Sequence, residues 1–368
     1  MNRFRKLVVE RVHAITEGDG NAARPVEEWA PIFDEANEYV WDNVAQLAPD
    51  IQVESERKLK RGRERRSREE IHNRRAHIKK LGAGLQHFDD AILLAEAANR
   101  DVFAAFTKWL RGKDVAEMAR SVTGHRKIAG GPACRIMTFL GLHARGCVLA
   151  SEISLLAHHG YTEGASSRAR SLYELTVIST FLSTKDSHPF PLTERYHLSG
   201  GVERQRDARG TNQPNPFQHE PGLEEAIRRT WGDRYFKPYG WAIPAVGDGK
   251  AKSVTFRDIE ESVELGHLRH AYLSMNHAVH AGAANVISNL DNRYPFGHRT
   301  GSHVNYYAAA WVLSAAAYFL QGMQIPLMLD IGELVEADTE LRLGPLLNSC
   351  RDAERVFKEF INTNFPEE

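Results

Sequence analysis

Two groups of side chains in this sequence are of types that move protons or stabilise negative charge. The first is a run of imidazoles within residues 261–290. On a helix turning about 100° per residue they share one face, opposite an apolar face, and they are His267, His270, His277 and His280. The second is Arg170 with Glu174, whose spacing of four residues makes them neighbours on a helix surface. Imidazole titrates near neutral pH, and guanidinium stabilises developing charge on a phosphate.

Each group also has a structural interpretation. The imidazole face is either the lining of a site or a solvated face with structural histidines. The residues around the Arg170–Glu174 pair are apolar, among them Leu172 and Val177, so the helix packs against others. The pair is then either a half-buried clamp or a positioned site pair. The sequence leaves both alternatives open.

The composition is that of a soluble globular protein, with 42% hydrophobic residues, 26% charged residues and a net charge of −1 over 368 residues. Cys134, Cys147 and Cys350 are far apart and form no CxxC motif, which fits neither a disulfide framework nor a zinc site. This usage indicates a reducing, cytoplasmic location. Residues 1–10 lack the apolar core of a secretory signal.

Charge is uneven along the chain, because residues 54–81 are dense in Arg and Lys. This basic segment has few apolar side chains to bury and predicts an exposed helix or a mobile segment. It could attract the phosphates of RNA. The alternative is a solvated helix held by Glu–Arg pairs four residues apart. No aromatic side chain interleaves the run to stack on bases.

Apolar residues recur at helical spacing in most of the chain, and no strong alternating strand pattern appears. The sequence therefore predicts an all-α fold, a multi-helix bundle with antiparallel helices and long loops. A Gly-rich loop cluster at 112–132 suggests a boundary. We expect an N-terminal helical region at 1–130, which includes the basic segment, and a C-terminal helical core domain at 131–368.

Several elements of that core domain can be placed. The expected helices cover 136–154, 165–182, 261–290, 304–329 and 334–360, with a turn at 158–164 and an interruption at Gly344-Pro345. The stretch at 304–329 is the longest apolar one. Asn305, Gln321 and Pro326 favour a buried core helix over a membrane span, and no membrane partner is expected.

Three strings of residues resemble an uncharacterised prokaryotic family of helical domains of unknown function, over roughly residues 135–285. They are Arg168-x-Arg170-x-Leu172-x-Glu174, Lys237-x-Tyr239-Gly240-Trp241, and Tyr272 followed by Asn276 and Val279-His280-Ala281. The family pattern has a serine where this chain has Asn276. The resemblance implies a helical fold and supplies no activity.

At a greater distance, the chain resembles the HEPN-type helical nucleases, which cleave RNA without metal using an Arg and a His with four to six residues between them. Arg120–His125 and Arg293–His298 have that spacing, but such pairs are frequent by chance in a chain with 17 histidines. The resemblance implies a metal-independent ribonuclease or phosphodiesterase without a cofactor, for example in defence against phage. The expected catalytic residues are Arg170, Glu174, His277 and His280, and the expected substrate-binding residues are Arg168, Tyr272, Asn276 and Tyr239.

Two other functions remain open. One is a non-catalytic helical module that binds a protein partner or a second copy of the chain. The other is a helix-bundle metal enzyme, because Glu-x-x-His pairs are typical of such sites. The candidate ligands are Glu194 with His197, Glu264 with His267, and the carboxylates Glu152 and Glu174. The spatial arrangement of Arg170, Glu174 and the late histidines separates these alternatives.

Overall fold

The computed structural model describes residues 3–16, 26–111, 131–187, 191–211, 222–246, 249, 251–277, 279, 290–291, 297–298, 304–331 and 340–366. The chain divides into two compact units, Met1–Glu69 and Glu70–Glu368. The division lies well before the expected boundary at residue 130. Helix α4 (Pro49–Arg111) runs through it, and residues from Leu81 onward belong to the large core of the second unit.

The first unit is built on a small helical hairpin. Its elements are α1 (Arg3–Thr16), α2 (Val26–Asp42), α3 (Val44–Leu47) and the beginning of α4. The buried residues of its core are Val8, Val12, Ile32, Ala36 and Val40. Arg3 Nη1 pairs with Asp50 Oδ2 at 2.5 Å and ties α1 to the start of α4.

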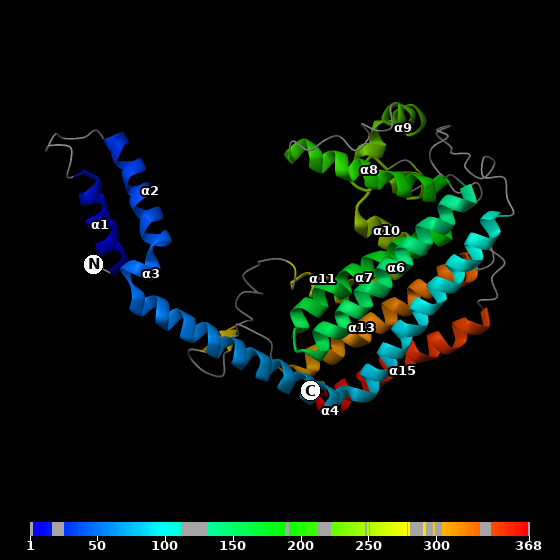
Figure 1. The fold of residues 1–368 in the computed structure, drawn as a ribbon. Helices are drawn as coiled ribbons and strands as arrows, with labels where there is room; N and C mark the ends of the chain where they lie inside the picture. Colours follow the sequence, from blue (N-terminus) through cyan, green and yellow to red (C-terminus); the bar gives the residue numbers. More distant parts are fainter. Residues whose placement is uncertain are drawn as a thin grey trace. The chain divides into compact units, whose positions relative to one another are not determined.

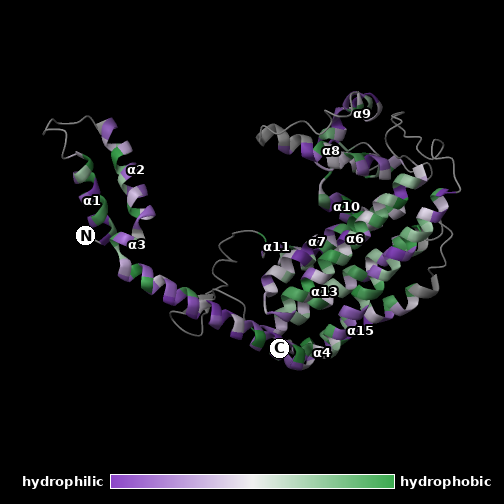
Figure 2. Cartoon of the chain, viewed as in Figure 1, coloured by the Kyte–Doolittle hydropathy of each residue, from purple (hydrophilic) through white to green (hydrophobic). Residues whose placement is uncertain are grey.

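The basic segment is part of α4, so the expected helix is present (Figure 2). It is largely exposed over residues 54–69, whereas Asn73, His77 and Leu81 near its end are buried. Two ion pairs join residues four apart within it, Lys58–Glu54 at 2.6 Å and Arg65–Glu69 at 3.5 Å. These are the pairs of a solvated helix, and such exposed pairs add little to stability.

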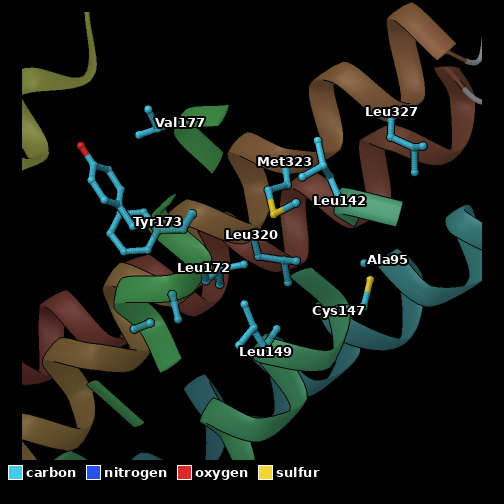
Figure 3. Close-up of a cluster of buried hydrophobic side chains, with 14 of the residues drawn as sticks. Ala95, Leu142, Cys147, Leu149, Leu172, Tyr173, Val177, Leu320, Met323 and Leu327 are labelled. Atoms are coloured by element: carbon cyan, nitrogen blue, oxygen red, sulfur yellow. The ribbon is translucent and has the colours of Figure 1, made fainter. Parts of the chain in front are cut away.

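The second unit is a bundle of long helices packed along one another (Figure 1). Its main members are α6 (Gly131–His158), α7 (Thr162–Lys185), α13 (Tyr306–Ile325), α15 (Glu340–Asn364) and the later part of α4. Helices α6 and α7 are joined by three residues, so they run antiparallel as expected. Figure 3 shows side chains of α6, α7 and α13 meeting in the core, among them Leu149, Leu172 and Leu320.

Glycine lets two pairs of these helices approach closely, α6 with α13 and α13 with α7. A Cβ at Gly146 of α6 would lie 2.6 Å from Met323 Sδ of α13, and one at Gly322 would lie 2.8 Å from Thr176 Cγ2 of α7. The Thr176 hydroxyl also donates to Phe319 O at 3.0 Å. At both points the missing side chain of glycine leaves room for a side chain of the facing helix.

Shorter elements complete the second unit. They are α8 (Pro191–Thr211), α9 (Leu223–Trp231), η2 (Asp233–Phe236), η3 (Gly240–Ala245), α10 (Phe256–Ser262), η5 (Leu265–Leu268), α11 (Arg269–Asn276), β1 (Leu290–Asp291), β2 (Gly297–His298) and the π-helical turn η6 (Pro326–Ile331). β1 and β2 pair antiparallel through Leu290 with His298 and Asp291 with Gly297. Apart from this short pair, the regular elements of the described residues are helical, which confirms the all-α class.

The single helix expected over 261–290 is wrong. Helix α10 ends at Ser262, Glu264 takes a left-handed conformation with φ 61°, and the chain restarts as η5 and α11. This break buries Glu260 and brings the carbonyl of Leu265 to the Tyr173 hydroxyl at 3.2 Å. Tertiary hydrogen bonds therefore prevail over the helical periodicity of the segment.

The two prolines act differently. Pro326 follows α13, which ends at Ile325, and begins a π-helical turn. Helix α15 continues through Pro345, so the expected interruption is wrong. Pro345 lies in the second turn, where one lost hydrogen bond is offset by burial of Leu343 and Leu346 beside it.

By length and composition, one helix among the described residues is apolar enough to cross a membrane, namely α6. Of the most apolar 18-residue stretch of α6, 56% is buried inside the protein, as in a core helix. The stretch expected as a buried helix at 304–329 is α13, and its residues are largely buried.

Candidate functional site

Three of the predicted site residues meet between α7 and α11. Arg170 Nη2 lies 2.9 Å from Glu174 Oε1 and donates to the Tyr272 hydroxyl at 3.3 Å. The Tyr272 hydroxyl in turn donates to Glu174 Oε1 at 3.2 Å. We call Arg170, Glu174 and Tyr272 the outer trio. Its closed ring of contacts joins residues about 100 positions apart in sequence.

The outer trio is partly open to solvent. The side chains of Arg170 and Glu174 are 21% and 32% exposed. Burial alone would lower the pKa of Arg170, but the Tyr272 hydroxyl and the Glu174 carboxylate more than compensate and raise it. The guanidinium therefore stays charged at a place that solvent can reach, which is what charge stabilisation on a bound anion requires.

A second trio of the same residue types lies beneath the first. Glu260 of α10 has a fully buried side chain; its Oε2 accepts from Arg269 Nη1 at 2.6 Å, and its Oε1 accepts from the Tyr173 hydroxyl at 2.5 Å. We call Tyr173, Glu260 and Arg269 the inner trio. Burial, followed by the hydrogen bond to Glu260, raises the pKa of Tyr173, so this phenol keeps its proton.

Aromatic packing connects the two trios. The rings of Tyr173 and Tyr272 lie 5.5 Å apart, and Phe256 packs on both, at 6.2 and 5.4 Å. Phe319 of α13 supports Tyr173 from the core at 5.0 Å. Because these rings are held from several sides, the Tyr272 hydroxyl has little freedom to leave the outer trio.

Tyr239 reaches the same region from the loop before η3. It has a left-handed backbone with φ 53°, and the charge of Glu174 contributes to raising its pKa, after burial. The next residue must be glycine, since a Cβ at Gly240 would lie 2.3 Å from Arg234 O. The Tyr-Gly pair in the Lys237-x-Tyr239-Gly240-Trp241 string is thus a backbone requirement of the loop that presents Tyr239.

A buried arginine holds this loop in place. Arg195 of α8 donates to the carbonyls of Gly240 and Trp241, each at 2.9 Å. Its guanidinium packs on the rings of Trp231 and Tyr235, and the Tyr235 hydroxyl returns a bond to Arg195 O at 2.6 Å. Burial lowers the pKa of Arg195 to about 10. This scaffold accounts for the dense aromatic group at 231–241.

Two polar atoms at the outer trio are unsatisfied. Within the described part of the chain, Arg170 Nε and Asn276 Oδ1 are buried and have no hydrogen-bond partner. Asn276 lies one helical turn after Tyr272, on the same face of α11. A buried donor and a buried acceptor without partners each cost about 1–3 kcal/mol, which a bound molecule could recover.

The other predicted site residues lie elsewhere. Arg168 turns to Glu152 at 3.1 Å and is not part of the outer trio. His277 is exposed, one residue past the end of α11, and its side chain makes no hydrogen bond or ion pair with the described residues. His280 lies outside the described residues, as do Arg120, His125 and Arg293. His267 and His270 are exposed, so the visible part of the imidazole face is solvated.

The metal hypothesis has little geometric support. In the ranges described above, no three His, Cys, Asp or Glu side chains gather as a metal site. Glu152 pairs with Arg168, Glu174 pairs with Arg170, and His267 bonds through Nδ1 to the carbonyl of Glu264 at 3.1 Å. Glu194 is buried on α8. The proposed carboxylate and imidazole ligands are thus engaged in different places.

The inner trio was not foreseen from the sequence. Glu260 stands in a polar string, FRDIEES, whose composition indicates a solvated helix. One local signal does fix that helix: Thr255 and Asp258 form a capping box, with Asp258 Oδ2 accepting from the Thr255 N–H at 2.7 Å. The cap sets where α10 starts and therefore which carboxylate turns inward.

Comparison with known proteins agrees with the resemblance at its coarse level. Residues 137–294 match the model of DUF5677, described as a family of unknown function. Neither the curated proteins nor the solved structures contain a match to the chain. The matched segment contains every residue of both trios, together with Tyr239 and Asn276, and excludes the basic segment. The likeness to an uncharacterised helical domain is confirmed over this segment, and the likeness to HEPN nucleases stays a prediction.

Proposed function

We propose that the outer trio is the centre of a metal-independent phosphodiesterase site that cleaves RNA, in the manner of HEPN-type nucleases. The observation that supports this most is the half-buried, charged guanidinium of Arg170 beside a carboxylate and a phenol. Its unsatisfied Nε and the Asn276 Oδ1 nearby leave both a donor and an acceptor for a ligand. A role in defence against phage and a cytoplasmic location stay predictions.

The proposed reaction is internal transesterification. The ribose 2′-hydroxyl attacks phosphorus, the P–O2′ bond forms, and the P–O5′ bond breaks to leave a 2′,3′-cyclic phosphate. Glu174 accepts the 2′-hydroxyl proton, and an imidazole of the 277–280 segment returns a proton to the 5′ oxygen. Arg170 stabilises the charge that grows on the phosphorane, while Tyr272 and Tyr239 position the substrate. The basic segment would bind the RNA phosphates.

The test compares two arginines on one helix. The full-length chain is incubated with single-stranded RNA in the presence of a chelator, and products are separated by size. Arg170→Ala should lower the rate by about 100- to 1,000-fold, the usual cost of removing one charge-stabilising donor. Arg168→Ala is the matched control and should stay within about threefold. Equal rates for both variants, or no cleavage by the unmodified chain, would reject the proposal.

The non-catalytic binding module is the second candidate, and one observation favours it. The three functional groups of the outer trio already contact one another across α7 and α11, as in a structural clamp. In that case Arg170→Ala should lower the melting temperature clearly while no turnover appears in any variant. Thermal unfolding measured on the same samples therefore separates the two functions.

A further inference from the structure

A groove between α4 and α6 lies apart from both trios. Its cavity volume is about 400 Å³, and it lies wholly within the second unit. The two helices are antiparallel there, because Asn99 meets His143 while Asp89 meets Ser154. Each helix contributes one stripe at helical spacing, Asp89, Ile92, Leu93 and Glu96 from α4, and Ser151, Ser154, Leu155 and His158 from α6.

The α4 stripe has a carboxylate at each end and apolar side chains between. Asp89 and Glu96 are seven residues apart, which is about 10 Å along the helix axis. Ile92 and Leu93 lie between them, and Leu155 faces them from α6; Leu93 and Leu155 are each 62% exposed. Two acidic ends joined by an apolar middle match a flexible alkyl chain with a cation at each end.

At one end of the groove, Asp89 is held by residues of α6. Asp89 Oδ1 accepts from the Ser154 hydroxyl at 2.6 Å, which leaves Oδ2 directed towards His158 Nε2 at 3.7 Å. That separation is too long for a hydrogen bond, and Nε2 is buried without a hydrogen-bond partner among the described residues. Burial lowers the pKa of His158, so its ring is neutral at pH 7 and Nε2 can be an acceptor.

The charged residues that line the groove favour a cationic ligand. Asp89 and Glu96 outnumber the single guanidinium, Arg74, which also lines the groove. Among the described residues, Glu96 has only a long ion pair with Arg100, at 3.8 Å, so its carboxylate remains open to a second cation. An anion would face two carboxylates, whereas an ammonium group has three donors for such acceptors.

We propose that this groove binds a linear aliphatic diamine, with one ammonium group at Asp89 Oδ2 and the other at Glu96. The alkyl chain then covers the exposed apolar side chains of Leu93 and Leu155. Each ammonium makes charge-assisted hydrogen bonds, which are about twice as strong as neutral ones. The site is independent of the outer trio and of RNA cleavage.

Isothermal titration calorimetry on the full-length chain tests the site with three probes. 1,7-Diaminoheptane, whose extended length suits the carboxylate spacing, should bind saturably at one site. n-Heptylamine, which carries one ammonium, should bind at least about tenfold more weakly, and inorganic phosphate should not bind. Equal affinity for the diamine and the monoamine would overturn the proposal, as would the absence of saturable binding by the diamine.

Matched substitutions on α4 locate the binding. Asp89→Asn and Glu96→Gln should each weaken diamine binding by about tenfold. Asp90→Asn is the control, because Asp90 is exposed and does not line the groove. Thermal unfolding verifies that each variant is folded. Equal affinity of the Asp89 and Asp90 variants for the diamine would also overturn the proposal. Binding would then depend on the net negative charge of the helix and not on the position of the carboxylate.

Discussion

The two trios use the same three residue types in different surroundings. In the outer trio, α7 supplies Arg170 and Glu174 and α11 supplies the tyrosine; in the inner trio, α7 supplies Tyr173 and the partners come from α10 and α11. The outer carboxylate, Glu174, is 32% exposed, whereas the inner one, Glu260, is fully buried. Solvent access is therefore the main difference.

The difference in solvent access gives the two trios different roles. A buried carboxylate that loses its partners costs several kcal/mol, so the inner trio holds α7, α10 and α11 in register. A partly exposed pair contributes little to stability, typically about 0–1 kcal/mol. The outer trio is consequently free to serve binding and catalysis, and the inner trio forms the base on which it stands.

Glu260→Ala should have the largest effect on stability. Arg269 and the Tyr173 hydroxyl would both lose their acceptor, and we expect a loss of about 3 kcal/mol in the free energy of unfolding. The value lies at the low end for buried pairs because the Arg269 side chain is 30% exposed and can be rehydrated. Urea denaturation measures it. A loss below about 1 kcal/mol would contradict the structural role of the inner trio.

Comparing the two trios at acid pH requires that another buried titratable side chain, His143, be replaced first. Burial lowers the pKa of His143 to about 4, whereas an unfolded histidine titrates near about 6.5. Between these values the unfolded state binds the extra proton. Stability should therefore fall as pH drops from about 6.5 to 4, by up to about 3 kcal/mol.

The variant His143→Gln should flatten the slope of stability against pH in this window, whatever its stability at neutral pH. His270→Gln, at an exposed position, should leave the slope as it is. Denaturant unfolding at several pH values gives both slopes. If the two variants had equal slopes, the acid sensitivity would have to be assigned to other groups, including the carboxylates of the two trios.

Tyr173→Phe removes one hydroxyl from the inner trio and keeps the ring. The hydrogen bond to the buried Glu260 would be lost, and we expect a loss of about 2 kcal/mol, since bonds to charged groups contribute about 1.5–3 kcal/mol. The comparison with the unmodified chain by urea denaturation checks this value. A neutral result would mean that Arg269 alone satisfies the carboxylate.

Glu174→Gln should have the smallest effect on stability. The amide oxygen can still accept from Arg170 and Tyr272, and only a partly exposed charge is lost. We expect a change below about 1 kcal/mol, measured in the same way. A loss as large as that of Glu260→Ala would erase the distinction between the trios.

The sequence predicted what depends on local spacing. Helical periodicity placed α6, α7 and α13, and the four-residue spacing of Arg170 and Glu174 predicted their contact. The prediction of one helix over 261–290 was wrong, because Glu264 is left-handed and ends the helix there. The predicted interruption at Pro345 was also wrong, because packing sustains α15 through that residue. Glu260 could not be foreseen, because its burial depends on Tyr173, which lies 87 positions away in the sequence. Tyr239 and Tyr272 came from the family resemblance, with no signal in their own spacing.

One measurement tests most directly whether the outer trio is a working site: the rates of RNA cleavage by Tyr272→Phe and Tyr173→Phe in the full-length chain. Both variants lose one hydroxyl, and each belongs to one trio. We predict that the cleavage rate of Tyr272→Phe falls by about 100-fold or more at nearly unchanged stability. The less stable Tyr173→Phe should cleave at a rate within about threefold of the unmodified chain. Equal rates for the two variants, or no cleavage by the unmodified chain, would contradict it.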